Sequence, residues 1–153
     1  MVKVVFICLG NICRSPMAEF GFKDMVKRQG LEKDFLIESR ATSSEALGCS
    51  VHRGTQKILT QKNIPFSDRQ ARKITQSDYD KYDLLIIMET ANYPNLLRTI
   101  GEDAQGKVHR LLDFTDNPAD IDDPWYTGDF ESTYRDIHLG CDALLKYIKE
   151  KLI

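Results

Sequence analysis

The chain opens with an apolar run that ends in a tight, polar turn. Residues 2–8 (Val-Lys-Val-Val-Phe-Ile-Cys) are short, rich in β-branched side chains and almost free of polar ones, which is typical of a strand buried on both faces. Gly10-Asn11 follows the run, and Ser15-Pro16 then predicts the start of a helix, with the Ser15 hydroxyl as its cap. A buried strand that leads directly into a helix indicates a parallel α/β fold.

The rest of the chain alternates between the same two patterns. Further strands are predicted at 35–40, 83–88 and 107–112, and helices at 16–30, 51–61 and 131–152. This alternation favours a doubly wound, mostly parallel sheet. We interpret residues 1–153 as a single domain, because no repeat and no linker rich in Pro, Gly or Ser divides them. The ligand site of such a sheet lies at the carboxyl ends of its strands, which points to the loop after Cys8.

Composition and charge exclude several classes of protein. The chain is 42% hydrophobic with a formal net charge of −2, which excludes disorder and gives no reason to expect nucleic acid as a partner. Its apolar runs are far shorter than the roughly 20 residues that span a membrane, and no signal-peptide cleavage site follows Met1. We therefore expect a cytoplasmic protein without a membrane partner. Its four cysteines, at positions 8, 13, 49 and 141, are spaced irregularly, as free cytosolic thiols are.

The loop between the first strand and the first helix has the composition of an anion cradle. Its backbone N–H groups and the positive end of the helix converge on one point, between the thiol of Cys8 and the guanidinium of Arg14. The planar fork of Arg14 can hold two oxygens of a phosphate, and the positive field favours the nucleophilic thiolate of Cys8. The alternative is a buried Cys beside a surface Arg. The residues expected to bind phosphate are Leu9, Gly10, Asn11, Ile12, Cys13, Arg14 and Ser15.

Residues 5–19 (Val-Phe-Ile-Cys-Leu-Gly-Asn-Ile-Cys-Arg-Ser-Pro-Met-Ala-Glu) resemble the signature of the low-molecular-weight protein tyrosine phosphatases. Residues 122–126 (Asp-Asp-Pro-Trp-Tyr) are similar to a second motif of that family, and 39–48 and 83–92 also resemble family segments. The resemblance implies a four-stranded parallel sheet with helices on both faces. It also implies hydrolysis of phosphotyrosine in proteins, and of small aryl phosphates, through a phosphocysteine intermediate without a metal or other cofactor.

The resemblance also implies the roles of three catalytic residues. Cys8 attacks phosphorus, Arg14 binds the phosphoryl oxygens, and Asp123 protonates the leaving oxygen and then activates water. Asp122 is the adjacent alternative for the acid, but Asp123 directly precedes Pro124, which restricts its backbone.

Supporting roles follow from the same resemblance. Asn11 is expected to hold the loop, with Ser39 as its hydrogen-bond partner, and Ser15 is expected to donate to the sulfur of Cys8. The walls of the crevice are expected to be the aromatic pair Trp125 and Tyr126 on one side and Glu45, Ala46 and Leu47 on the other.

Three residues depart from the pattern of the family. Glu45 stands where an aromatic residue is common, which weakens stacking on phosphotyrosine. Arg69 stands where many members have a His, and Glu89 where Asp is usual. An ion pair between Arg69 and Glu89 is one interpretation of the last two changes.

Two cysteines of the loop suggest redox control. Cys8 and Cys13 are five positions apart on one tight turn, so their Cα atoms can come within the range of a disulfide. Peroxide attacks a thiolate first, and a neighbouring thiol can trap the resulting sulfenic acid. We expect reversible inactivation through a Cys8–Cys13 bond, with Cys49 and Cys141 dispensable. The alternative is that Cys13 only packs beneath the loop.

Other functions fit parts of the pattern. The loop is also similar to that of the protein-arginine phosphatases, which have Thr at the position where this chain has Ile12. Thiol-dependent arsenate reductases need further cysteines between Cys49 and Cys141, where this chain has none. A phosphate carrier that does not hydrolyse its phosphocysteine needs no acid at Asp123. The last alternative is a zinc module with the ligands Cys8, Cys13, Cys49 and His52. The spacing of these four residues fits a tetrahedral zinc site poorly.

Overall fold

Four parallel strands form the centre of the molecule, in the order β2-β1-β3-β4. The computed structural model describes residues 1–153. Strand β1 (Val2–Cys8) pairs with β2 (Phe35–Ala41) on one edge and with β3 (Leu84–Ile87) on the other, and β4 (Val108–Arg110) pairs with β3. Strand β1 has a strand on each edge and helices over each face, so the side chains on both of its faces are buried. This burial explains why β1 is apolar. The predicted four-stranded parallel sheet is confirmed.

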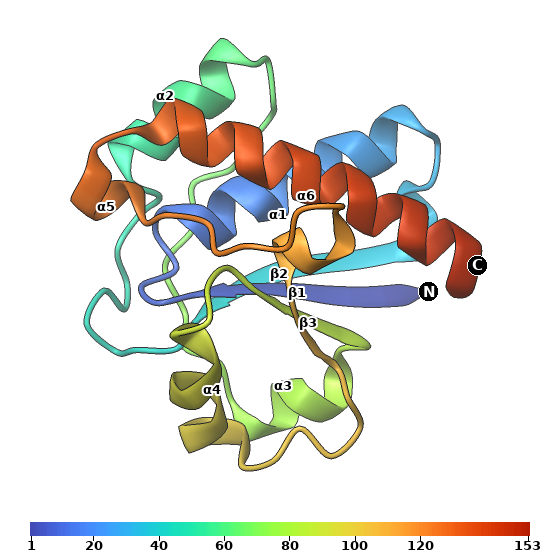
Figure 1. The fold of residues 1–153 in the computed structure, drawn as a ribbon. Coiled ribbons are helices and arrows are strands. Elements are labelled where there is room, and N and C mark those ends of the chain that lie inside the picture. The colour runs from blue at the N-terminus through green and yellow to red at the C-terminus, as the bar shows by residue number, and fades with distance from the viewer.

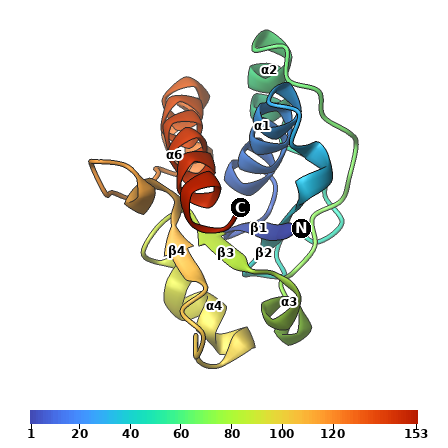
Figure 2. The same ribbon diagram turned by 90° about the vertical axis from the view of Figure 1, so that its right-hand side faces the viewer.

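Helices cover both faces of the sheet, as predicted (Figures 1 and 2). One face carries α1 (Arg14–Arg28), α2 (Arg53–Gln61) and α6 (Phe130–Lys151), and the other carries α3 (Gln76–Lys81) and α4 (Asn92–Ile100). The remaining elements are the short helix α5 (Pro124–Thr127) and two 3-10 helices, η1 (Glu32–Asp34) and η2 (Leu111–Phe114). No helix of the protein is long and apolar enough to cross a membrane.

The side chains of β1 supply both halves of the core. Val4 and Phe6 belong to the buried cluster beneath α1 and α6, whereas Val5 and Ile7 belong to the cluster on the side of α3 and α4. Successive side chains of a strand point to opposite faces, so a strand buried on both faces is apolar at every position. This burial fixes where β1 ends, and therefore where Cys8 lies.

The start of α1 differs from the prediction. The helix begins at Arg14, its N-cap is Cys13, and no side chain caps it. The Ser15 hydroxyl lies inside the helix and is engaged elsewhere, 3.0 Å from Cys8 Sγ and within reach of the Asn11 amide. The prediction that Ser15 caps the helix is therefore wrong, because the loop uses that hydroxyl.

Three α-helices, namely α3, α4 and the four-residue α5, were not predicted from the sequence. Both α3 and α4 are short, and each contributes few side chains to the core, so no long apolar stripe marks them. A local signal for α3 exists, because Thr75 and Asp78 form a reciprocal capping box at its start. In the chain, α3 leads into β3, and α4 connects β3 to β4.

The strand order places a crevice at the carboxyl end of β1. The chain passes from β1 through α1 to β2 on one side, and then crosses to β3 on the other side of β1. The loops that follow β1 and β3 therefore diverge, and a ligand site is expected in the space between them.

Candidate active site

The loop after β1 surrounds the sulfur of Cys8 with hydrogen-bond donors. Strand β1 holds Cys8 at its carboxyl end, where the side chain is only 3% exposed. The backbone N–H groups of Asn11 and Ser15 donate to Cys8 Sγ over 3.3 and 3.4 Å, and Ser15 Oγ lies 3.0 Å away. Donors that converge at the start of a helix stabilise negative charge at that point.

Asn11 holds the loop in its unusual shape. Its φ angle of 58° is in the left-handed region, which Asn tolerates better than most residues. The Asn11 amide donates to Ser15 Oγ at 2.8 Å and to Ser39 Oγ at 2.9 Å, so the contact expected with Ser39 is present. Its side-chain oxygen accepts from Arg69 Nη1 and from the backbone N–H of Arg72, both at 3.1 Å. All polar atoms of this buried side chain are therefore satisfied.

Arg69 binds both the side chain and the backbone of Asn11. Its Nη2 donates to the Asn11 carbonyl at 2.9 Å, and burial lowers the pKa of this guanidinium from its ordinary value. The ion pair between Arg69 and Glu89, one interpretation of the two departures, is not formed, because Glu89 binds Arg14 instead, at 2.7 Å. The reason is topological: Arg69 lies in the segment beside β2 and Glu89 follows β3, and these two strands flank β1 on opposite sides.

Arg14 is the most enclosed charge of the site. Its side chain is 1% exposed, and its Nη1 donates to Glu89 Oε2 at 2.7 Å and to the Ile121 carbonyl at 2.8 Å. Its Nη2 lies 3.3 Å from Asp123 Oδ2. Burial alone would lower the pKa of Arg14, but Cys8, Asp123 and Glu89 outweigh it and raise the pKa. The guanidinium is therefore held charged and in one orientation.

Asp123, not Asp122, reaches the cleft. One oxygen of Asp123 caps α5 by accepting the Trp125 N–H at 3.0 Å, and the other faces Arg14. Asp122 is exposed. Its backbone carbonyl accepts a hydrogen bond from Thr133 Oγ1 at 3.3 Å. The turn before Pro124 thus directs the two carboxylates differently.

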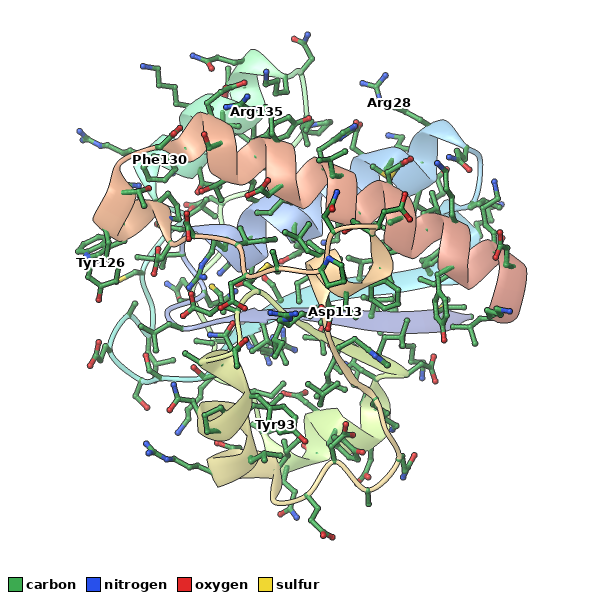
Figure 3. The ribbon with its side chains drawn as sticks, viewed as in Figure 1. Arg28, Tyr93, Asp113, Tyr126, Phe130 and Arg135 are labelled. Carbon is green, nitrogen blue, oxygen red and sulfur yellow. The ribbon has the colours of Figure 1, made fainter.

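A cleft of about 370 Å³ opens above Cys8. Glu45 and Ala46 line one side of it as expected, whereas Leu47 is not among the lining residues. The opposite wall is Trp125, 61% exposed, and Tyr126, 78% exposed, which projects from α5 at the edge of the molecule (Figure 3). The loop residues that line the cleft are Cys8, Leu9, Gly10, Ile12, Cys13 and Arg14. A flat aromatic group entering the cleft would meet the two exposed rings.

The other cysteines are placed differently from one another. Cys13 is buried in the loop, and burial together with the negative charges of Cys8 and Asp123 raises its pKa to about 12. Cys49 is exposed and lines the cleft, which its position in the sequence did not suggest. Cys141 is buried in α6.

The zinc alternative finds no ligand set. No three or more His, Cys, Asp or Glu side chains are grouped so that they could hold a metal ion.

Residues 3–152 match the family model described as low molecular weight phosphotyrosine protein phosphatase. The chain belongs to this family. It is 39% identical over 153 residues to the low molecular weight protein-tyrosine-phosphatase YfkJ of Bacillus subtilis, covering 99% of this chain and 98% of that protein. It is 40% identical over 149 residues to PtpA of Staphylococcus aureus, covering 97% of this chain and 94% of PtpA.

Solved structures of the family agree with the fold. The crystal structure of Bacillus subtilis YfkJ has a TM-score of 0.96 and 38% identity, covering all of this chain and 98% of that one. The protein tyrosine phosphatase of Entamoeba histolytica, solved with Hepes in its active site, has a TM-score of 0.91 and 27% identity over the whole of both chains. This member of the family is therefore a phosphatase that hydrolyses phosphotyrosine in proteins.

Some residues of the site were not found from the sequence. Glu19 accepts a hydrogen bond from Ser39 Oγ at 2.5 Å and so closes the network behind Asn11. The Ile121 carbonyl fixes Arg14, but a backbone oxygen has no signature in a sequence. Glu19 is the last residue of the signature 5–19, which is the one signal that could have indicated it.

Proposed function

We propose that this phosphatase transfers the phosphoryl group to Cys8 and then to water. In the first step the Cys8 thiolate attacks phosphorus and the P–O bond to tyrosine breaks. The leaving oxygen takes a proton from Asp123, without which a phenolate would be a poor leaving group. The observation that carries the proposal is that Cys8 and Arg14, from the loop after β1, and Asp123, from a segment more than 100 residues further along the chain, line one cleft.

The second step releases phosphate. Asp123, now a carboxylate, takes a proton from water as the water oxygen attacks the phosphocysteine, and the P–S bond breaks. The sulfur leaves as a thiolate. Ser15 Oγ, 3.0 Å from that sulfur, and the two backbone N–H groups beside it stabilise the charge that returns to it.

Arg14 binds the phosphoryl oxygens in both steps. Its fork fits two equatorial oxygens of a trigonal-bipyramidal transition state. Glu89 and the Ile121 carbonyl hold Nη1, so little reorganisation is needed as charge develops. Trp125 and Tyr126 stack on the aromatic ring of the substrate, and inorganic phosphate or another oxyanion occupies the same loop.

The test is turnover by Cys8→Ser, with Cys49→Ser as the matched control in the same cleft. We expect Cys8→Ser to lose activity on a phosphotyrosine peptide by a factor on the order of 10⁴ or more. It should still bind phosphate, whereas Cys49→Ser should stay within a few-fold of the wild type. Acid quench of Asp123→Ala with labelled substrate should trap phosphate on Cys8.

Two results would contradict the mechanism. Substantial turnover by Cys8→Ser would show that another group attacks phosphorus, and loss of wild-type activity in EDTA would show that a metal takes part. Free phosphoarginine serves as a second substrate. Faster turnover of phosphoarginine than of phosphotyrosine would assign the cleft to protein-arginine phosphatase activity instead.

A further inference from the structure

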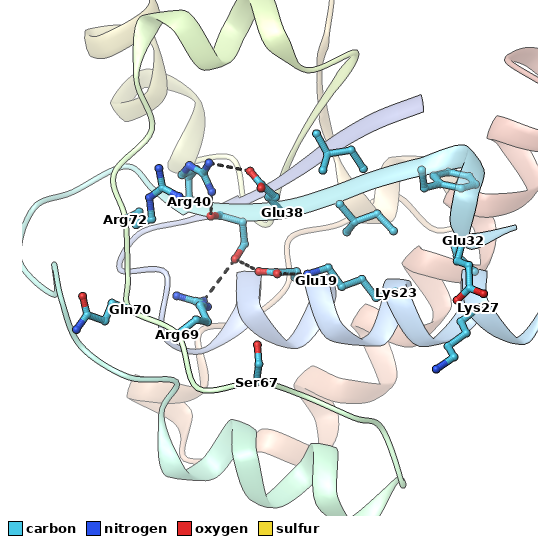
Figure 4. Close-up of a pocket in the computed structure, with 15 residues that line it drawn as sticks. Glu19, Lys23, Lys27, Glu32, Glu38, Arg40, Ser67, Arg69, Gln70 and Arg72 are labelled. Carbon is cyan, nitrogen blue, oxygen red and sulfur yellow. Dashed lines mark hydrogen bonds and ion pairs between the residues drawn. The ribbon is translucent and has the colours of Figure 1, made fainter. Parts of the chain in front are cut away.

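A second cavity, of about 740 Å³, lies along strand β2 between α1 and the segment 67–72 (Figure 4). It shares no lining residue with the catalytic cleft. The consecutive residues 35–40 of β2 form its floor. We call this cavity the β2 groove. Since its floor is a strand, the hydrogen-bonding state of that strand decides what the groove can bind.

One edge of β2 has no strand partner along residues 35–40, and on it the Ser39 carbonyl accepts a hydrogen bond from Arg40 Nη1 at 2.8 Å. At its carboxyl end, the Ala41 N–H donates to the Arg72 carbonyl at 2.7 Å, and the Ala41 carbonyl accepts from the Ile74 N–H at 2.8 Å. The backbone direction alternates along a strand, so Ile37 and Ser39 point their N–H groups to this same side. Strand β1 is the only strand paired with residues 35–40, and it lies on the other side. An open strand edge is a template on which another strand can add.

The walls of the groove carry an excess of positive charge. The acids Glu19 and Glu38 are already paired, with Lys23 at 2.6 Å and Arg40 at 2.8 Å. Figure 4 shows Glu19, Lys23 and Arg69 on one side of β2. Three cations have no ion-pair partner, namely Lys27, Arg69 and Arg72, against one acid, Glu32.

We propose that the β2 groove docks an extended acidic segment of a partner protein, which adds to the open edge of β2 as a further strand. The backbone of the segment would pair with Ile37 and Ser39, whose side chains face α1. Side chains of an added strand that lie opposite these two residues point to the same face. Acidic residues at every second position would therefore meet Lys27 and Arg69, which have no ion-pair partner, and intervening residues would face the other side of the sheet.

The probe is a labelled peptide of about eight residues that alternates Val and Asp, long enough at roughly 3.3 Å per residue to span the open edge. Fluorescence anisotropy compares it with an alternating Val-Lys peptide and with a Val-Asp peptide methylated on every backbone nitrogen. We expect binding of the unmodified Val-Asp peptide and a loss of at least about tenfold in affinity for the other two. Hydrogen exchange should slow at the Ile37 and Ser39 amides when the peptide is bound.

The variant that tests the location is Lys27→Glu/Gln70→Glu, which reverses one charge and adds another in the groove. Its matched control is Lys146→Glu/Gln61→Glu, the same change of charge on α6 and α2. We expect the groove variant to bind the Val-Asp peptide about tenfold more weakly, because attraction becomes repulsion at position 27 and a new repulsion is added at position 70. The control should bind the peptide as the wild type does. Neither variant alters the cleft, so both should hydrolyse a small aryl phosphate at the wild-type rate.

Several outcomes would overturn the proposal. Equal affinity of the methylated peptide would mean that charge alone attracts it, without strand addition. Equal affinity of the groove variant would place binding elsewhere. Sedimentation velocity showing that the protein self-associates, with the same two amides protected, would make a second copy of this chain the occupant. None of these results depends on the residue roles in the catalytic cleft.

Discussion

At the scale of single residues, the proposed mechanism depends on Asp123 as the general acid of the cleft. Asp123→Ala is expected to lower kcat on phosphotyrosine by about 10²–10⁴, the usual contribution of general acid catalysis. The loss should be smaller on aryl phosphates whose phenol is already acidic, because these leave without a proton. Steady-state kinetics on a series of phenols measures both effects.

The neighbouring carboxylate is the control for that prediction. Asp122 is exposed and does not line the cleft, so Asp122→Ala should change kcat no more than a few-fold. If Asp122→Ala proves the more damaging change, the acid has been assigned to the wrong residue.

Cys13 is the second residue whose role a substitution can decide. Peroxide should convert Cys8 to a sulfenic acid, which the Cys13 sulfur attacks to form the disulfide with loss of water. Wild-type enzyme should then recover with dithiothreitol, Cys13→Ser should not, and phosphate in the loop should protect both. Because the pKa of Cys13 is raised to about 12, its thiolate fraction, and with it the trapping rate, should rise about tenfold per pH unit in the neutral range.

Cys49 belongs in the same experiment, since it lines the cleft. Cys49→Ser should behave as the wild type after oxidation and reduction. Full recovery of peroxide-treated Cys13→Ser would leave Cys13 with a packing role only, and loss of recovery in Cys49→Ser would make Cys49 the resolving thiol.

At the scale of elements, α6 packs closely against η2 at Gly140. A Cβ atom added at Gly140 in α6 would overlap the side chain of the buried Leu111 in η2. We expect Gly140→Ala to lower the free energy of unfolding by about 1–3 kcal/mol, because the packed neighbour must shift. Urea denaturation at neutral pH measures the change.

Gly21 in α1 provides the matched substitution. An added Cβ at Gly21 would meet no atom within 4 Å, and Ala is the better helix former. Gly21→Ala should therefore raise the free energy of unfolding, by up to about 1 kcal/mol. If the two substitutions had equal effects, the contact between α6 and η2 would not be a tight one.

At the scale of the whole molecule, the site exists only in the folded chain, because it joins the loop after β1 to Glu89, Ile121 and Asp123. A ligand that binds only the folded state stabilises it, by about 2.7 kcal/mol at one hundred times its dissociation constant. Saturating phosphate should thus raise Tm by about 5–10 °C.

Arg14→Lys separates this effect from a general effect of salt. A lysine offers a point charge in place of the fork, so most of the rise in Tm with phosphate should disappear. Arg28→Lys, on the exposed end of α1, should keep the full rise. A calorimetric scan in phosphate and in chloride at equal ionic strength makes the comparison, and an unchanged rise in Arg14→Lys would place phosphate elsewhere.

The local features of this protein were readable from the sequence alone. The buried strand at 2–8, the turn at Gly10-Asn11 and the loop from Cys8 to Arg14 were predicted where the structure has them. Each of these depends on residues close together in the chain, through side-chain periodicity, backbone preference and the field at a helix start. The parallel sheet followed for the same reason, since alternating strands and helices leave few other arrangements.

The partners of the charged and polar side chains were decided by the tertiary structure. Arg69 supports Asn11 and Glu89 holds Arg14, because the strand order puts β2 and β3 on opposite sides of β1. The Ser15 hydroxyl faces Cys8 and does not cap the helix. Ion pairs and hydrogen bonds form between whichever groups the packing brings within about 3 Å, and a sequence carries no local pattern for residues that meet only after the sheet has assembled.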